Sequence, residues 1–397
     1  MWFRLFFLIC VVLAPLSAAR ADVKQTVKSQ APSGLVFVIN EKGDVLVSQN
    51  ADKTFVPASV AKIATAWFAM EVLGPNHRFE TSFYMDDKRV LYVRGGGDPF
   101  MISEELAILA PRLLAKTKKK PFSGIVVDTS YYPDGLRMAG IENTDRSYNA
   151  LNSALAVNFN TIFAVRDGKT VRSAEEQTPI TPLAIQQFVE RGKKGRSRIS
   201  LAQEKPEVSA LYAGELLAAF IEKSGGKNEG DVKIGRVPAN LKPIHVHRQS
   251  RDLAEILRQM LLGSNNYIAN QLFLEIGAHK LGGPVSIEKS LKVTRALLAK
   301  HGLSKSITLV EGSGLSRENK FTAQGLGQLL DKFAPYAELM TKSKKGSRYK
   351  TGSLSDVRTL AGFAETENNG LVRFVISLPG NTGKLRFRLL NIIEREL

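Results

Sequence analysis

Three strand-like runs near the C-terminal end of the chain constrain its fold most strongly. They lie at residues 349–354, 358–364 and 371–378, and only short turns separate them. Runs of this length and spacing are typical of a strand meander. An amphipathic helix predicted at 385–396 closes the chain. This end of the chain therefore predicts a layered α/β domain.

Elements of the same kind begin soon after the N-terminus. Strand-like runs at 34–39 and 45–47 flank a turn and predict a hairpin, and a helix with one apolar face follows at 57–73. Further helices are predicted at 251–262, 267–281, 285–300 and 322–333, the last with Thr322 as its N-cap. We interpret the two ends as one α/β domain, residues 22–84 plus 246–397. A separate β-rich module with some helix, residues 85–245, interrupts it.

Composition and charge narrow the class of protein. The 397 residues are 44% hydrophobic and 23% charged, which are globular values for one large domain or two to three ordinary ones. The formal net charge of +17 favours anionic partners or surfaces. The excess lies in the last third, because residues 246–397 carry a net charge of +10, and the densest basic run is 342–350. That run is either a solvated basic loop or a surface that attracts an anionic partner.

The first residues have the layout of a secretory signal peptide. One positive charge precedes the apolar run 5–16, and small residues follow up to Ala21. We expect cleavage after Ala21 and an exported, periplasmic product, because the run is too short for a permanent membrane anchor. A buried N-terminal helix is the alternative. The single cysteine, Cys10, excludes a disulfide framework, and export disfavours nucleic acid as a partner.

Two residue pairs and one tripeptide are candidates for a catalytic site. Ser59 and Lys62 lie three residues apart at a predicted helix start, so a hydroxyl and an amine share one face of the first turn. The helix dipole there favours a developing oxyanion. Ser264 and Asn266 lie in the break between two predicted helices, and Lys350-Thr351-Gly352 lies on the first strand of the meander.

Neither pair is specific alone. The Ser-x-x-Lys and Ser-x-Asn spacings recur at Ser224/Lys227, Ser286/Lys289, Ser48/Asn50 and Ser147/Asn149. Order and context are more specific: a helix start, then a helix–helix break, then a strand. This order matches the three-part signature of penicillin-binding proteins and the related β-lactamases.

Residues 50–62 resemble the active-site entry of class C low-molecular-mass penicillin-binding proteins, of the penicillin-binding protein 4 type. These are D-alanyl-D-alanine carboxypeptidases and endopeptidases. The resemblance extends over most of the chain through segments 95–99, 264–266, 312–317 and 350–354. Two positions depart from the pattern, since Asn265 and Glu311 stand where Asp is common or expected. The resemblance implies a serine β-lactamase/DD-peptidase-like transpeptidase domain, an antiparallel sheet with helices on both sides, interrupted by a β-rich inserted domain.

The resemblance also implies an acyl-enzyme mechanism. Ser59 would be the nucleophile and neutral Lys62 its base, with burial and the second cation of Lys350 lowering the pKa of Lys62. Ser264 would pass a proton to the departing amine, and Asn266 would hold the substrate amide. The substrates would be peptidoglycan stem peptides and crosslinks, and β-lactams would inhibit covalently.

The tripeptide and its neighbour would bind the substrate. Lys350 and Thr351 would hold the terminal carboxylate of the leaving residue. The backbone N–H groups of Ser59 and Ser353, next to Gly352, would form an oxyanion hole. Water would hydrolyse the acyl-enzyme. No cofactor, metal or transmembrane anchor is implied, and the sequence identifies no protein partner.

Three alternatives remain open. A β-lactamase of the same fold is disfavoured, because the sequence has no Glu-x-x-Leu-Asn segment and a large inserted module is unusual there. A metallopeptidase is suggested by His245 and His247, which would share one face of a strand, but the sequence offers no nearby third ligand. The third alternative is a wall-binding protein on a degenerate peptidase scaffold.

The middle module is shorter than in the longest relatives, which nest a further domain inside it. With about 160 residues there, we expect an open cleft that admits a bulky acyl acceptor. The sequence therefore predicts endopeptidase activity on crosslinked dimers beside carboxypeptidase activity.

Overall fold

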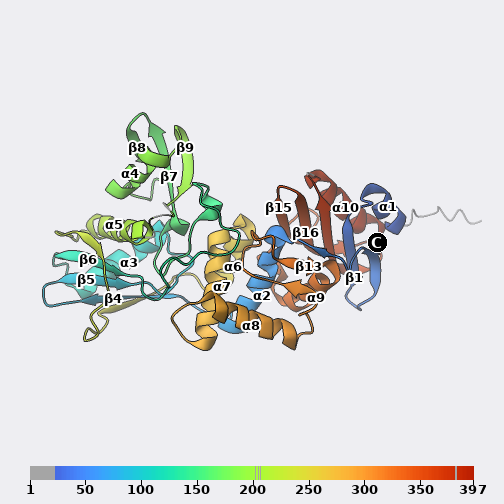
Figure 1. Ribbon diagram of the computed structural model, residues 1–397, viewed down its shortest axis with the longest axis horizontal. Helices are drawn as coiled ribbons and strands as arrows, with labels where there is room; N and C mark the ends of the chain where they lie inside the picture. Colours follow the sequence, from blue (N-terminus) through green and yellow to red (C-terminus); the bar gives the residue numbers. More distant parts are fainter. Residues whose placement is uncertain (1–22, 202, 204, 206, 381) are drawn as a thin grey trace, which may run out of the picture.

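The computed structural model describes residues 23–397 except 202, 204, 206 and 381, so the predicted signal peptide lies outside the described residues. The largest sheet has six strands, all antiparallel, in the order β14-β15-β16-β17-β1-β2 (Figure 1). The strands are β14 (Thr341–Lys342), β15 (Arg348–Leu354), β16 (Val357–Thr366), β17 (Gly370–Pro379), β1 (Leu35–Asn40) and β2 (Val45–Gln49). The predicted hairpin and meander are confirmed, and they pair with each other through β1 and β17.

Helices cover both faces of this sheet. Val36 and Val38 of β1 pack in one core with α1 (Val23–Gln30) and α10 (Gly383–Glu396), whereas Phe37 packs in the opposite core with α2 (Lys62–Leu73) and α9 (Ala323–Phe333). Successive side chains of a strand point to opposite faces, so the apolar run of β1 serves both cores. The expected antiparallel sheet with helices on both sides is confirmed.

The predicted helices are also found. They are α2, α6 (Leu253–Gly263), α7 (Asn266–Leu281), α8 (Ile287–Lys300) and α9. The Thr322 side chain accepts a hydrogen bond from the backbone N–H of Gly325, which confirms it as the N-cap of α9. In α2 and α7 most residues are buried, so these two helices form the centre of the molecule. A small sheet of β3 (Thr54–Phe55), β13 (Lys320–Thr322) and β12 (Ile307–Thr308) lies beside them.

The middle of the chain forms two further sheets (left in Figure 1). One contains β10 (Val232–Ile234), β6 (Gly124–Asp128), β5 (Val90–Arg94), β4 (Glu80–Met85) and β11 (His245–Arg248). The other contains β8 (Thr170–Ser173), β7 (Thr161–Asp167) and β9 (Gly195–Ser200). Three helices accompany these strands: α3 (Ser103–Lys116), α4 (Pro182–Arg191) and α5 (Glu207–Lys223). Helices α3 and α5 pack together, and α5 lies against β6, so this part has its own apolar core.

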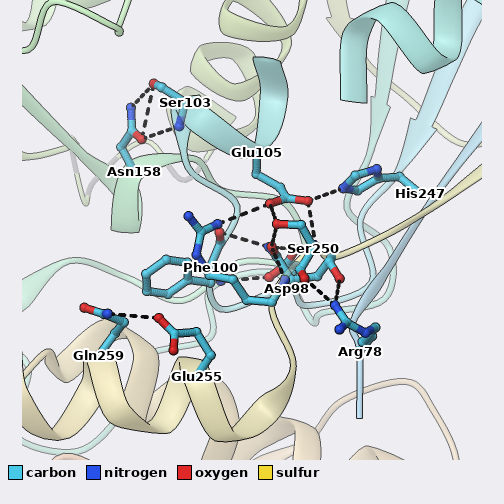
Figure 2. Close-up of polar contacts among 12 residues, drawn as sticks. Arg78, Asp98, Phe100, Ser103, Glu105, Asn158, His247, Ser250, Glu255 and Gln259 are labelled. Atoms are coloured by element: carbon cyan, nitrogen blue, oxygen red, sulfur yellow. Dashed lines mark hydrogen bonds and ion pairs between the residues drawn. The ribbon is translucent and has the colours of Figure 1, made fainter. Parts of the chain in front are cut away.

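A buried polar cluster lies between the two parts of the molecule (Figure 2). The carboxylate of Glu105 accepts hydrogen bonds from the backbone N–H and the hydroxyl of Ser250, and it lies 2.7 Å from His247 Nε2. The Gln249 amide donates to Asp98 over 2.8 Å. Burial raises the pKa of Asp98 to about 6. The His247 ring, considered above as a metal ligand, is thus held by a buried carboxylate.

Among the helices of the described residues, none is both long enough and apolar enough to span a membrane.

Candidate active site

Ser59 lies at a tight entry into the central helix. It belongs to the 3-10 helix η1 (Ala58–Ala61), which leads directly into α2. Ala58 has a φ of 49°, a left-handed conformation that costs a non-glycine residue roughly 1–2 kcal/mol. Such strain persists where the surroundings fix the backbone, and here it turns the chain immediately before Ser59.

Lys62 is the first residue of α2, and its side chain is fully buried. Its Nζ atom lies 3.0 Å from Ser59 Oγ, 2.7 Å from Asn266 Oδ1 and 2.7 Å from the carbonyl oxygen of Ser313. The Asn266 amide nitrogen donates to the carbonyl of Tyr148, which fixes the amide with its oxygen toward Lys62. One buried amine therefore connects three separate segments of the chain.

The environment of Lys62 favours its neutral form. Burial lowers the pKa of Lys62 well below its usual value, and the positive charge of Lys350 lowers it further, while Glu311 acts in the opposite direction. Burial dominates because taking an ammonium group out of water disfavours the charged form.

The loop after β12 presents the Ser313 carbonyl to Lys62. The buried carboxylate of Glu311 accepts hydrogen bonds from the backbone N–H groups of Ser313 and Gly314, both over 2.7 Å, and from the amide of Asn319 over 2.6 Å. Gly314 has a φ of 80°, and a Cβ atom there would lie 1.8 Å from the carbonyl oxygen of Ala58. The glycine therefore allows this loop to lie against the turn that precedes Ser59, and the longer Glu311 side chain organises the loop where Asp was expected.

Ser264 and Asn266 lie at the break between α6 and α7, as predicted. Ser264 ends α6 in a left-handed conformation with a φ of 52°, and the side chain of Asn265 caps α7 by accepting from the N–H of Ile268. Asn265 thus performs the N-cap role for which Asp and Asn are both suited. Ser264 and Asn266 both border a cavity of about 340 Å³.

Strand β15 lies against the start of the helix that carries Ser59. A Cβ atom on Gly352 would lie 2.8 Å from the carbonyl oxygen of Pro57 and 3.0 Å from the backbone nitrogen of Ser59. Thr359, which is opposite Gly352 in the sheet register, donates its hydroxyl to the same Pro57 carbonyl over 2.8 Å. Glycine is therefore needed at 352 for the strand to approach Ser59, and this approach places Ser353 next to it in the chain.

Lys350 is almost fully buried on β15, whereas Thr351 is half-buried and Ser353 is exposed. Burial, and then the nearby positive charge of Arg386, lower the pKa of Lys350 to about 8. Arg386, on α10, donates to the carbonyl of Gly352 over 2.7 Å and contacts Ser353 Oγ at 3.3 Å.

The contacts of the Ser-x-x-Lys pairs differ from one pair to the next. The Lys289 amine donates to the carbonyls of Gly282 and Pro284, and Ser286 caps α8. Lys227 forms an exposed ion pair with Glu229. Of the Ser-x-x-Lys pairs at Ser59, Ser224 and Ser286, the pair at Ser59 therefore contacts a Ser-x-Asn motif.

Four contributors to this site were not predicted from the sequence. They are the carbonyl groups of Ser313 and Tyr148, the Glu311 carboxylate as an organiser of the loop, and Arg386. Every residue has a backbone carbonyl, so the sequence does not indicate which carbonyl contributes to a site. Arg386 lies in an ordinary amphipathic helix, and only the departure at Glu311 drew attention to its position.

The chain is similar to known proteins in both sequence and fold. Residues 17–339 match the model of the D-Ala-D-Ala carboxypeptidase 3 (S13) family. A D-alanyl-D-alanine carboxypeptidase of Actinomadura sp. (strain R39) is 26% identical over 453 residues, which cover 95% of this chain and 81% of that protein. The crystal structure of penicillin binding protein 4 from Haemophilus influenzae superposes with a TM-score of 0.75 at 21% identity, covering 94% of this chain and 100% of that one. A predatory endopeptidase of Bdellovibrio bacteriovorus, in complex with an immunity protein, has a TM-score of 0.54 at 18% identity, with 90% and 91% covered.

Proposed function

The chain belongs to the D-Ala-D-Ala carboxypeptidase 3 (S13) family, and from this we propose that it is a serine DD-peptidase of peptidoglycan. It cleaves terminal D-Ala-D-Ala bonds of stem peptides and the crosslinks between them, and β-lactams acylate the same serine. The Actinomadura relative is named a carboxypeptidase, and the Bdellovibrio structure, which is similar in fold, is named an endopeptidase, so each proposed activity has a precedent.

The contacts of Lys62 carry this proposal. A neutral amine has two N–H donors and one lone pair. Its two shortest contacts, at 2.7 Å, are with the oxygens of Asn266 and Ser313, which only accept hydrogen bonds. Those two contacts use both donors, so the lone pair is left for Ser59 Oγ at 3.0 Å. A buried base within hydrogen-bond distance of a hydroxyl is the arrangement that activates a serine nucleophile.

Acylation then proceeds with each proton accounted for. Ser59 Oγ attacks the carbonyl carbon of the penultimate D-alanine, and Lys62 takes the hydroxyl proton. The carbonyl oxygen becomes an oxyanion, for which the N–H groups of Ser59 and Ser353 are the donors. Ser264 gives its proton to the amine as the C–N bond breaks, and it regains a proton from Lys62. Asn266 binds the substrate amide, and a water molecule later hydrolyses the ester.

The group bound on the leaving side is a carboxylate. Lys350 is largely charged near neutral pH with a pKa of about 8, and Thr351 follows it on the same strand with a hydroxyl donor. A charged amine and a neutral hydroxyl are both donors that suit a terminal carboxylate. This assigns Lys350 and Thr351 to the C-terminal residue of the substrate.

We further propose the division of the chain into a catalytic domain, residues 22–84 plus 246–397, and an inserted domain, residues 85–245. The buried apolar residues around the five-stranded sheet support it, since all of them except Phe83 come from positions within 85–245. Strands β4 and β11, which pair with each other, cross the two borders. Export to the periplasm after removal of residues 1–21 fits a peptidoglycan substrate.

Labelling with a fluorescent penicillin tests the function. The wild-type chain should be labelled once, at Ser59, and Ser59→Ala should abolish labelling without unfolding the protein. Ser224→Ala, at another Ser-x-x-Lys match, is the control and should be labelled normally. Labelling of the Ser59→Ala variant at another serine, found by peptide mass mapping, would overturn the assignment.

A further inference from the structure

Two adjoining cavities extend from the Ser-x-Asn motif toward the inserted part. The first, about 340 Å³, is bordered by Ser264 and Asn266. The second, about 300 Å³, shares four bordering residues with the first and continues to Phe100 and Gln259. The shared residues are Phe159, Arg198, Gly263 and Asn265. We call the two cavities together the side pocket.

Phe159 is held in the side pocket by an unusual turn. Asn158, Phe159 and Asn160 all have left-handed backbones, with φ values of 53°, 60° and 58°. Asparagine tolerates this conformation, whereas phenylalanine rarely adopts it. The Phe159 ring lies at an angle to the Phe100 ring, with centroids 5.4 Å apart.

Buried hydrogen bonds fix both ends of this turn. Figure 2 shows Asn158 beside Ser103, whose backbone N–H donates to the Asn158 side-chain oxygen over 2.9 Å. Asn160 accepts from the Ser209 hydroxyl over 2.8 Å and donates to the carbonyl of Leu151 over 2.8 Å. The surroundings thus impose a strained backbone that brings one aromatic ring to the pocket beside Ser264, which is where strain is expected to serve function.

Arg198 places an ion-paired guanidinium group at the same pocket. Its guanidinium pairs with Glu175 over 2.6 Å, donates to the hydroxyl of Thr161 over 3.0 Å and lies 4.5 Å above the Phe163 ring. The Arg198 side chain nevertheless remains 31% exposed. A guanidinium held in one orientation and still open to solvent is suited to bind a carboxylate.

We propose that the side pocket binds the second stem peptide of a crosslink, the one whose amine departs, and that Phe159 and Arg198 determine this specificity. The inference rests on the proposed function: Ser264 gives its proton to the departing amine, so the group attached to that amine leaves on the side where the pocket begins. A stem peptide has aliphatic and charged parts. Phe159 packs against the aliphatic part, Arg198 binds a carboxylate, and Glu175 is placed for an ammonium group.

Kinetics on two substrates test this proposal. The full chain and the variants Phe159→Ala and Arg198→Ala receive crosslinked muropeptide dimers and uncrosslinked pentapeptide in separate reactions, followed by mass spectrometry. Each variant should lower kcat/KM for the dimer about ten-fold, which corresponds to one charge-assisted or well-packed contact. Release of D-alanine from the pentapeptide and the rate of penicillin acylation should change less than about two-fold.

Arg196→Ala is the matched control. Arg196 is on the same strand, and its guanidinium also lies over the Phe163 ring, at 4.8 Å, but it does not border the side pocket. The Arg196→Ala variant should therefore have unchanged kcat/KM for both substrates. Thermal unfolding identifies a Phe159 variant that is merely unstable, and Arg198→Ala then decides the question.

Equal losses on both substrates, or unchanged cleavage of the dimer, would overturn the proposal. A wild-type chain that is labelled by penicillin and releases D-alanine but never cleaves dimers would overturn it while leaving the DD-peptidase function intact. Absence of both labelling and peptidase activity would instead refute the proposed function, and this inference with it.

Discussion

The Asn266 Oδ1 atom lies 2.7 Å from Lys62 Nζ, so a direct hydrogen bond connects two helices, α7 and α2, that are far apart in the sequence. The other side of the same amide donates to the carbonyl of Tyr148, in the middle part of the chain. Asn266 therefore connects the Ser-x-Asn motif with Lys62 on one side and with Tyr148 on the other. Its neutral amide makes this contact without placing a negative charge beside Lys62.

Replacing this amide by a carboxylate should slow acylation. In Asn266→Asp a negative charge would lie beside Lys62, favour its protonated form and raise its pKa, so less neutral base is present at pH 7. We expect penicillin acylation at pH 7 to fall about 100-fold and the rising limb of its pH–rate profile to shift to higher pH. Asn266→Ala should slow acylation without that shift. The same profile for both variants would contradict the electrostatic explanation.

The pKa of Lys350 predicts a second pH dependence. Burial, and then Arg386, lower it to about 8, so the positive charge that binds a carboxylate is lost as the pH rises above that value. We expect kcat/KM for a D-Ala-D-Ala peptide to fall above about pH 8. Arg386→Gln removes a positive neighbour, raises the pKa of Lys350 and should move the falling limb to higher pH. Arg386→Lys retains the charge and should leave the falling limb of the pH profile in place. A limb that moves equally in both variants would show that the charge of Arg386 does not set the pKa of Lys350.

Glu311 should contribute strongly to stability. In Glu311→Gln the side-chain nitrogen would replace one carboxylate oxygen, so the backbone N–H group of either Ser313 or Gly314 would lose its acceptor while buried. We expect the free energy of unfolding to fall by about 2–4 kcal/mol in denaturant titrations. Glu318→Gln, an exposed glutamate of the same loop, should change it by less than about 0.5 kcal/mol. Similar values for the two variants would show that the buried carboxylate has no special role.

Periodicity and caps made much of the fold predictable. The hairpin, the meander and the helices around the break at Ser264 follow from alternating or helical apolar patterns, and Thr322 was recognisable as a cap. The strands and helices in the middle of the chain were harder to predict. The strands there are short, and α5 is apolar on most sides, so its pattern lacks the one-sided periodicity that identifies a surface helix.

The site was predictable only as far as side-chain type carries information. Ser59, Lys62 and Asn266 form one contact group, as their motifs suggested. The carbonyl of Ser313 was not predictable, because any residue supplies a carbonyl and only the loop geometry aims this one at Lys62. The left-handed backbone of residues 158–160 could not be predicted either, because Asn-Phe-Asn is no recognised turn sequence.

Glu275 should make stability depend on pH. Burial raises its pKa to about 8, although Tyr132 and Tyr131 donate hydrogen bonds to its carboxylate over 2.8 Å and 3.1 Å. The folded chain therefore holds a proton that the unfolded chain has lost above its usual pKa of 4.5, so the contribution is present at low pH and disappears as the pH rises toward 8. We expect the free energy of unfolding to fall by up to about 1.4 kcal/mol per pH unit.

The free energy of unfolding should be measured between about pH 6.5 and 8, because Asp98, with a pKa of about 6, titrates mainly below this range. Glu275→Gln should flatten the slope in that window. Glu71→Gln removes an exposed carboxylate of α2 and should retain the slope. A slope that persists in Glu275→Gln would assign it to another group.

The basic run before Lys350 should make turnover depend on salt. Lys342, at the end of β14, and Lys344, between β14 and β15, are both exposed. Strand β15 carries Lys350, and stem peptides carry several carboxylates. Attraction over a Debye length raises the rate of encounter, so kcat/KM for polymeric peptidoglycan should fall several-fold between about 20 and 200 mM salt. The double variant Lys342→Glu/Lys344→Glu should be slower at low salt and nearly independent of salt. Reversing Lys118 and Lys119, in the loop after α3 at the other end of the molecule (Figure 1), is the control and should retain the wild-type dependence. Salt-independent turnover by the wild-type chain would leave the run as an ordinary solvated loop.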